Sequence, residues 1–198
     1  IAEELKRLKY TTAHVGKWHL TPRDGVEHPG LWPEAQGFDK NIGGFSAGAP
    51  GSYHWPYGRG KDKEGGKVIN LPGKGKPGDY LTDTLTDEAV KIIDDWKDDP
   101  FFIYFSYYTV HTPIQAKADY VNAFESKVKK NARHTNAAYA AMIRSLDESV
   151  GRVMARLEKH GLADNTVIML TGDNGGLLEM GNKVRVTSNL PSRNGKGS

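Results

Sequence analysis

The sequence contains no cysteine, has no long apolar run and carries no large excess of charge of either sign. The absence of cysteine excludes disulfide frameworks, thiolate zinc sites and cysteine nucleophiles within these 198 residues. No apolar stretch reaches the roughly 18 residues that a transmembrane helix requires, so we expect no membrane segment. With 27 Lys and Arg against 24 Asp and Glu, the formal net charge of +3 is too balanced to indicate a nucleic-acid partner.

Helical periodicity alternates with short apolar runs, which predicts an α/β fold with a mainly parallel sheet flanked by helices. The predicted helices cover residues 1–9, 79–96, 118–128 and 135–160, and the predicted strands cover residues 11–15, 101–108 and 167–170. The most apolar of these runs, residues 101–108, is expected to be a central buried strand. Residues 21–78 show no persistent period and are interpreted as an irregular insertion. Its aromatic residues could line a substrate pocket, or they could pin the insertion to the core.

The stretch Thr166–Gly176 (TVIMLTGDNGG) combines an apolar run with a polar turn. The apolar part, residues 167–170, predicts a strand that is buried on both faces. Asp173 and Asn174 would follow the carboxyl end of that strand, and the two glycines after them allow a close approach to a ligand. A carboxylate and a carboxamide are hard oxygen donors that suit Ca²⁺ or, less well, Mg²⁺. The same residues also favour an ordinary turn.

Polar residues follow two further predicted strands. Lys17 and His19 come after the first strand, and in an extended chain their side chains point the same way. His111 comes after the most apolar strand, where a histidine can serve either in structure or in proton transfer. Lys196 lies between two glycines near the end of the chain. Because the carboxyl ends of parallel strands meet at one edge of the sheet, these groups together predict a site for a tetrahedral oxyanion ester.

Six motifs in the sequence resemble those of the sulfatase family, within the alkaline-phosphatase-like superfamily of metal-dependent hydrolases. In chain order they are Gly16–Leu20 (GKWHL), Gly37–Asp39 (GFD), Tyr80–Asp83 (YLTD), His111–Ile114 (HTPI), Thr171–Gly176 (TGDNGG) and Gly195–Gly197 (GKG). The first, fourth and fifth motifs are individually distinctive. One departure is Gly172, where the family usually has serine.

The resemblance implies a partial alkaline-phosphatase-like domain and assigns roles to four residues of the expected site. Asp173 and Asn174 correspond to Ca²⁺ ligands. Lys17 and Lys196 correspond to lysines that contact the sulfate oxygens. The implied substrate is therefore a sulfate ester, a class that includes sulfated glycans, and the implied location is secreted or periplasmic.

The resemblance also assigns two histidines and a nucleophile. His19 matches the histidine implicated in releasing sulfate from a covalent intermediate, and His111 matches one near the ester oxygen that assists the leaving group. The family's nucleophile is a formylglycine made from a Cys/Ser-x-Pro-x-Arg motif, which this sequence lacks. The similar run at residues 190–193 does not qualify, because Asn189 stands where the Cys or Ser is needed.

We therefore interpret residues 1–198 as part of one sulfatase catalytic domain, with the nucleophile and the paired aspartates of the metal site upstream and a further part downstream. The 198-residue chain alone is expected to show little or no turnover. Two alternatives stay open at this point. The protein could be a phosphate or phosphonate ester hydrolase of the same superfamily, or a non-catalytic relative that binds glycans or acts as a scaffold.

Overall fold

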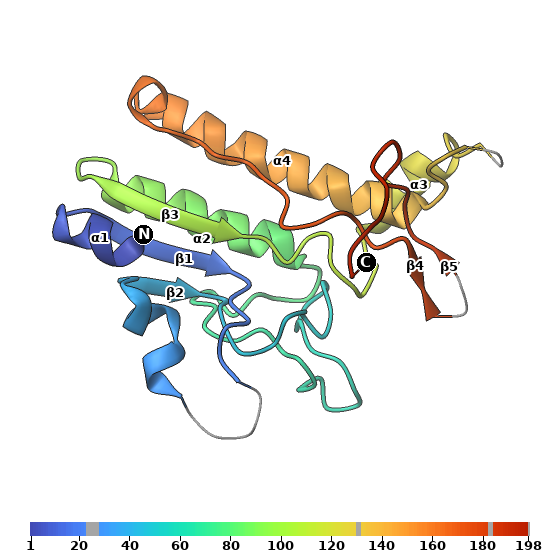
Figure 1. Ribbon diagram of the computed structural model, residues 1–198, viewed down its shortest axis with the longest axis horizontal. Helices are drawn as coiled ribbons and strands as arrows, with labels where there is room; N and C mark the ends of the chain where they lie inside the picture. Colours follow the sequence, from blue (N-terminus) through green and yellow to red (C-terminus); the bar gives the residue numbers. More distant parts are fainter. Residues whose placement is uncertain (23–27, 130–131, 182–183, 198) are drawn as a thin grey trace.

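A three-stranded parallel sheet lies at the centre of the protein (Figure 1). The computed structural model describes residues 1–22, 28–129, 132–181 and 184–197. The strands of the sheet are β1 (Thr11–Gly16), β2 (Lys40–Ile42) and β3 (Phe101–Ser106). They lie in the order β2-β1-β3, and β1 pairs in parallel with both neighbours. The expected α/β class with a parallel sheet is therefore confirmed.

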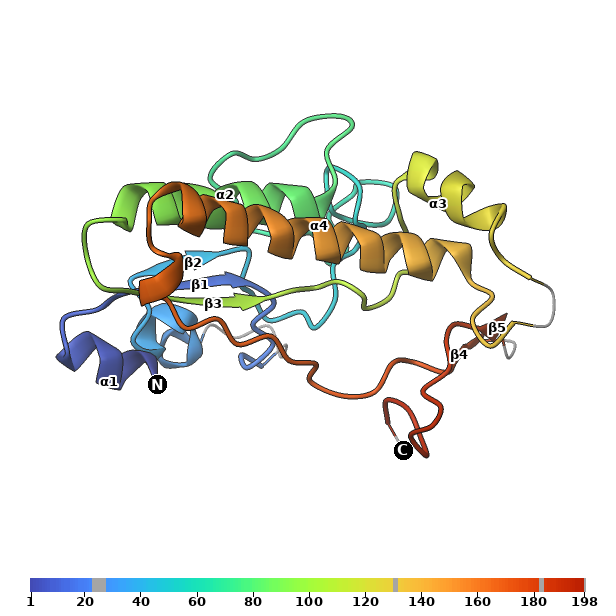
Figure 2. The same ribbon diagram turned by 90° about the horizontal axis from the view of Figure 1, so that it is seen from above.

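Helices form at all four predicted places, and α2 and α4 lie together on one side of the sheet (Figure 2). The helices are α1 (Ala2–Arg7), α2 (Leu81–Trp96), α3 (Ala118–Glu125) and α4 (Ala137–Lys159), with short 3₁₀ helices η1 (Pro29–Leu31), η2 (Pro33–Gln36) and η3 (Ala163–Asn165). The Asn136 side chain caps α4 by accepting a hydrogen bond from the Tyr139 N–H at 2.9 Å. Within the described ranges, none of these helices is long and apolar enough to cross a membrane.

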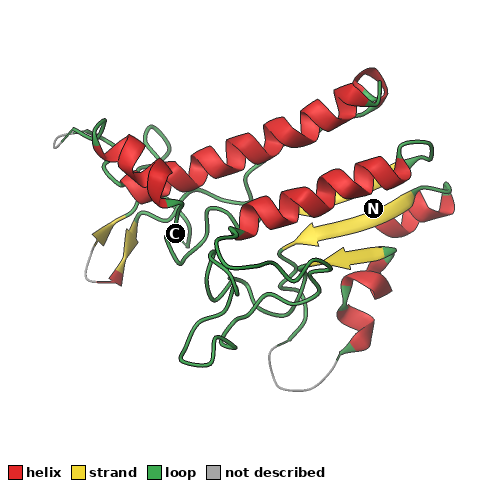
Figure 3. Cartoon of the chain, turned by 180° about the vertical axis from the view of Figure 1, so that it is seen from behind, coloured by secondary structure: helices red, strands yellow, loops and turns green. Residues whose placement is uncertain are grey.

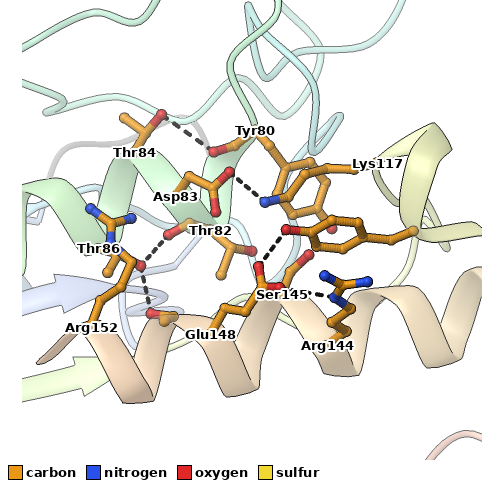
Figure 4. A network of polar contacts seen from close by, with 12 residues as sticks. Tyr80, Thr82, Asp83, Thr84, Thr86, Lys117, Arg144, Ser145, Glu148 and Arg152 are labelled. Atoms are coloured by element: carbon orange, nitrogen blue, oxygen red, sulfur yellow. Dashed lines mark hydrogen bonds and ion pairs between the residues drawn. The ribbon is translucent and has the colours of Figure 1, made fainter. Parts of the chain in front are cut away.

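Polar side chains, in addition to apolar ones, form contacts between the helices (Figure 4). The hydroxyls of Thr86 in α2 and Ser149 in α4 lie 2.5 Å apart in a fully buried position. Glu148 of α4 accepts hydrogen bonds from the Tyr120 hydroxyl of α3 at 2.5 Å and from Arg144 Nε at 2.9 Å. These bonds satisfy polar groups between the helices, so the helical layer has a defined packing.

The prediction of a buried strand at residues 167–170 is wrong. These residues form no strand, and Val167 and Met169 are each 88% exposed. The run has the composition of a buried strand, but no strand of the described residues lies beside it. A strand needs a neighbour for its backbone hydrogen bonds, and an apolar pattern alone cannot supply one.

The strand at β3 lies at an edge of the described sheet and is not the central strand that was predicted. Among the described residues β3 pairs only with β1, and its Tyr104 side chain is 49% exposed. The central strand is β1, whose residues from Thr12 to Gly16 are buried. The short strand β2 was not predicted, because its sequence Lys-Asn-Ile carries no apolar period. A second, two-stranded sheet pairs β4 (Glu179–Met180) with β5 (Val184–Arg185) in the tail.

Aromatic residues pin much of the 21–78 segment to the core. Phe45, Tyr53 and Tyr57 are buried in the same cluster as β1 and α2. The Tyr57 hydroxyl lies 2.7 Å from Thr84 Oγ1 on α2. The interpretation of these aromatics as anchors therefore holds for these three residues.

His14 is fully buried in the middle of β1, although it is ionisable. Its Nε2 lies 3.1 Å from the carbonyl oxygen of Lys17, which only accepts hydrogen bonds, so Nε2 carries the proton. Its Nδ1 has no hydrogen-bond partner in the described part of the chain. Burial lowers the pKa of His14, and the imidazole is therefore held neutral.

We expect the free energy of unfolding to fall as the pH drops below about 6.5, the ordinary pKa of histidine. In that range the unfolded chain takes up a proton that the buried His14 imidazole does not, so protonation favours the unfolded state. Urea denaturation between pH 8 and pH 5 measures the effect, and His14→Phe should make the dependence shallower. An equally steep dependence in the variant would contradict this role of His14.

Candidate functional site

Lys17 is held in place by the close packing of β1 against β3. Gly16 has a φ of +102°, and a Cβ at this position would lie 2.0 Å from the carbonyl oxygen of Ser106. The Lys17 N–H donates to the same oxygen at 2.7 Å, and the Lys17 carbonyl accepts from His14 Nε2. Glycine is therefore required before Lys17, and both ends of the lysine's backbone are fixed.

His111 lies in the segment after β3, where backbone contacts fix its position. Its N–H donates to the Tyr108 carbonyl at 2.8 Å, and its own carbonyl accepts from the Tyr53 hydroxyl at 3.0 Å. Its Nδ1 lies 3.0 Å from the Thr112 carbonyl, so Nδ1 carries a proton in the neutral ring. Its Nε2 has no partner among the described residues, and this nitrogen is the one that can exchange a proton with a ligand.

The glycine pair of the TGDNGG motif packs against the segment that carries Lys196. Asn189 joins the two, since its Oδ1 accepts from the Gly176 N–H at 2.9 Å and its Nδ2 donates to the Gly176 carbonyl at 2.8 Å. The Lys196 N–H donates to that same carbonyl at 3.3 Å. A Cβ on Gly195 would lie 2.5 Å from the Gly176 oxygen, so the backbones can approach this closely only without side chains.

Charges from three distant parts of the chain interact at this site. The pKa of Lys17 is lowered by burial and by the charge of Lys196, and the Asp173 carboxylate opposes that change. The pKa of His111 is lowered by burial and by the charges of Lys196 and Lys17, against a hydrogen bond to Thr112 and the Asp173 carboxylate. Figure 3 shows the loops and the C-terminal tail gathered at the end of the sheet to which the strands point. Lys17 and His111 thus lie within electrostatic range of each other and of both Asp173 and Lys196.

His19 takes a different orientation from the one expected for an extended chain. Its φ is +61°, so the chain turns at this residue. The side chain is exposed, and a Cβ on Gly48 would lie 2.4 Å from the imidazole Cε1, so the ring lies against the loop after β2. The neighbouring Trp18 packs against the body of the protein: its Nε1 donates to the Leu31 carbonyl at 2.8 Å, and its ring meets His14 edge-on.

Asp173 and Asn174 are both exposed and offer hard oxygen donors. The Asn174 Nδ2 donates to the Gly175 carbonyl at 3.1 Å, which leaves its Oδ1 for a cation. Ca²⁺ takes six to eight oxygen ligands. Across the described ranges, no group of three or more His, Asp or Glu side chains could hold a metal ion. The pair therefore fits part of a Ca²⁺ site that needs further ligands.

Two residues that support the site carry no recognisable signal in the sequence. Asn189, which stands out in the sequence only because it cannot form formylglycine, joins Gly176 to the tail. The buried Tyr53 supports His111 from a segment without periodicity, and Gln115 Oε1 accepts from the Tyr53 N–H at 2.9 Å. Both roles depend on contacts between residues far apart in the chain, and a single sequence does not report such contacts.

We expect Tyr53→Phe in the complete protein to lower kcat by about 10- to 100-fold, because a small displacement of a reacting group is costly. The variant removes the hydroxyl whose single proton is shared between the Tyr108 carbonyl at 2.5 Å and the His111 carbonyl at 3.0 Å, and it keeps the ring in the core. Tyr80→Phe is the control, since it removes a buried hydroxyl that donates to the Gln115 carbonyl instead. Steady-state rates and thermal midpoints of both variants separate positioning from stability. Equal losses of kcat would show that Tyr53 acts through stability alone.

Lys17 follows β1 and His111 follows β3 at the carboxyl edge of the parallel sheet, where the charges of Asp173 and Lys196 act on both residues. The chain belongs to the Sulfatase family, whose model matches residues 1–197.

Similar proteins include two curated relatives and one solved structure. The chain is 32% identical over 190 residues to the uncharacterized sulfatase YdeN of Escherichia coli. This alignment covers 86% of this chain and 31% of YdeN. The chain is also 31% identical to arylsulfatase J of Mus musculus, in an alignment that covers 100% of this chain and 31% of arylsulfatase J. The structure of Ps i-CgsB in complex with k-i-k-neocarrahexaose has 30% identity and a TM-score of 0.77, and covers 100% of this chain and 43% of that one. The chain thus spans about a third of the length of these curated relatives.

Proposed function

We propose that the complete protein containing this chain hydrolyses sulfate esters, and that residues 1–198 form part of its catalytic domain. The proposal is supported by the placement of Lys17 after β1 and of His111 after β3, with Asp173 and Lys196 near enough for their charges to act on both, in a chain of the Sulfatase family. In the reaction, water cleaves the bond between sulfur and the ester oxygen and yields an alcohol and hydrogen sulfate.

The two lysines bind and orient the sulfate group. Lys17 is partly buried and its backbone is fixed, whereas Lys196 is exposed on the glycine-flanked tail. Two positive charges on one group of oxygens neutralise the charge that grows there as the ester bond breaks. The partly buried Lys17 has the larger effect, because charges interact more strongly where water is displaced.

His111 is assigned to the leaving group. Its Nδ1–H is oriented toward the Thr112 carbonyl, so when Nε2 is protonated as well, the imidazolium can pass the Nε2 proton to the ester oxygen as the alcohol departs and return to the neutral ring. His19 is assigned to the departure of sulfate, in line with its place in the GKWHL motif. Asp173 and Asn174 would hold Ca²⁺, which supplies positive charge beside the sulfate oxygens when it is bound. The nucleophile, a formylglycine by family resemblance, is not among these residues, and the 198-residue chain alone should therefore not turn over.

A sulfated glycan is the substrate class we propose. The support is the similarity to a structure in complex with an oligosaccharide, k-i-k-neocarrahexaose. An exposed site at the surface of the sheet edge can also accept one residue of a longer chain.

Hydrolysis by the complete protein tests the proposal. We expect turnover of 4-nitrophenyl sulfate to exceed that of 4-nitrophenyl phosphate, and His111→Gln to lower kcat by about 10²- to 10⁴-fold. Preference for the phosphate would instead identify a phosphate ester hydrolase. Binding of the oligosaccharide without any turnover would identify a non-catalytic glycan-binding protein.

A further inference from the structure

Residues 54–79 carry the net charge of the whole chain. They contain six basic and three acidic side chains, and this surplus equals the formal net charge of +3. Lys67 is paired with Glu64 at 2.6 Å. Five of the six basic side chains have no ion-pair partner among the described residues, and all five are exposed: Arg59, Lys61, Lys63, Lys74 and Lys76. Uncompensated positive charge on one segment attracts polyanions.

Trp55 lies in the same segment and is 38% exposed, whereas Tyr53 and Tyr57 on either side of it are buried. Its indole is held in place, because a Cβ on Gly75 would lie 2.9 Å from Trp55 Cδ1. The backbone N–H of Trp55 donates to the Asp79 carbonyl at 3.0 Å. A fixed, partly exposed indole presents an apolar face beside the cations, a combination that is enriched in binding surfaces.

Backbone hydrogen bonds order this segment, and the side chain of the preceding Tyr53 connects it to the candidate site. The Gly51 N–H donates to the Gly66 carbonyl at 2.7 Å, and Arg59 exchanges hydrogen bonds with Gly65 at 2.8 and 3.0 Å. Tyr53, two residues before Trp55, contacts the His111 carbonyl. The segment is therefore ordered before a ligand arrives and lies next to the segment that carries His111.

We propose that Trp55 with Arg59, Lys61, Lys63, Lys74 and Lys76 forms a subsite, here called the loop patch, for sugar units of a sulfated glycan beyond the one that is cleaved. The indole stacks on the apolar face of a sugar ring, and the cations contact its sulfate groups. This inference rests on the proposed function, since it concerns the remainder of the same substrate. A nucleic acid is the less favoured ligand, because the rest of the chain has no charge surplus to follow a long polyanion.

The test uses the complete protein and k-i-k-neocarrahexaose, with its desulfated counterpart and a single-stranded oligodeoxynucleotide as comparisons. We expect Lys74→Glu with Lys76→Glu to raise the Kd for the sulfated oligosaccharide by about tenfold and to reduce its dependence on salt. Trp55→Ala should raise the Kd by a similar factor with the salt dependence preserved. Turnover of 4-nitrophenyl sulfate, which is too small to reach the loop patch, should change less than twofold.

Lys9→Glu with Lys159→Glu is the matched control, since both lysines are exposed, lie outside the segment and give the same change in net charge. An equal loss of affinity in the control would overturn the proposal, as would oligodeoxynucleotide binding as tight as that of the sulfated sugar. If no sulfate ester is turned over but binding still depends on the loop patch, the proposed hydrolysis fails and the subsite stands. If turnover occurs and the patch variants bind normally, the subsite alone is refuted.

Discussion

Replacing Lys17 with alanine in the complete protein is expected to lower kcat/KM for a sulfate ester by about 10²- to 10³-fold. The ammonium group is partly buried and interacts with Lys196 and Asp173, so its loss removes a fixed positive charge where sulfate oxygens bind. The backbone bonds to Ser106 and His14 involve main-chain atoms of Lys17 and persist in the variant. Steady-state kinetics with 4-nitrophenyl sulfate measure the effect, and circular dichroism confirms the fold.

The pH dependence distinguishes a required charge from a packing effect. The pKa of Lys17 is lowered by burial and by Lys196, so activity should be lost at an alkaline pH below the ordinary lysine pKa of about 10.4. The arginine of Lys17→Arg keeps its charge at that pH, so the loss of kcat/KM should occur at a higher pH in this variant. Lys9→Ala, at an exposed position, is the control for losing a lysine. Unchanged kinetics in Lys17→Ala would remove Lys17 from the sulfate site.

The helices could be predicted from the sequence because their information is local. The apolar spacing in residues 79–96 matches α2, where Leu81, Leu85 and Ile92 are buried. The Gly161 that marks the end of α4 has a φ of +68°, a conformation that ends helices. Periodicity and end signals report directly on a helix, whose hydrogen bonds join residues four apart.

The strands were harder to predict because their partners are distant. Residues 167–170 resemble a buried strand yet lie exposed. In contrast, β2 forms from residues that show no pattern, because β1 lies beside them. For the site, the motifs indicated Lys17, His111, Asp173 and Lys196, and the structure brings their charges together.

The supporting contacts of that site could not be predicted. Asn189 and Tyr53 act through backbone atoms of Gly176 and His111, and neither residue belongs to a motif. Which side chain meets a given carbonyl is fixed only by the fold as a whole.

The second large effect is expected from Asp173→Asn, which we predict weakens Ca²⁺ binding by at least about 100-fold. The substitution keeps the shape and one oxygen but removes the negative charge, and affinity for Ca²⁺ depends on the number of charged ligands. A ligand that binds the folded state and not the unfolded state stabilises the protein, by about 2.7 kcal/mol when free Ca²⁺ is at 100 times its Kd. The measurement is the shift of the thermal midpoint on adding Ca²⁺ or EDTA, which does not depend on catalysis.

Asp164→Asn is the matched control, because Asp164 is exposed in η3, a few residues before the motif, and the charge change is the same. We expect it to keep the full Ca²⁺-dependent shift, whereas Asp173→Asn loses the shift and sulfate ester turnover together. Loss of turnover with a normal shift would place Asp173 at the sulfate group instead of the cation. A normal shift with normal turnover would exclude Asp173 from the site. The carboxylate that opposes the lowering of the Lys17 and His111 pKa values in the active protein would then have to be a different one.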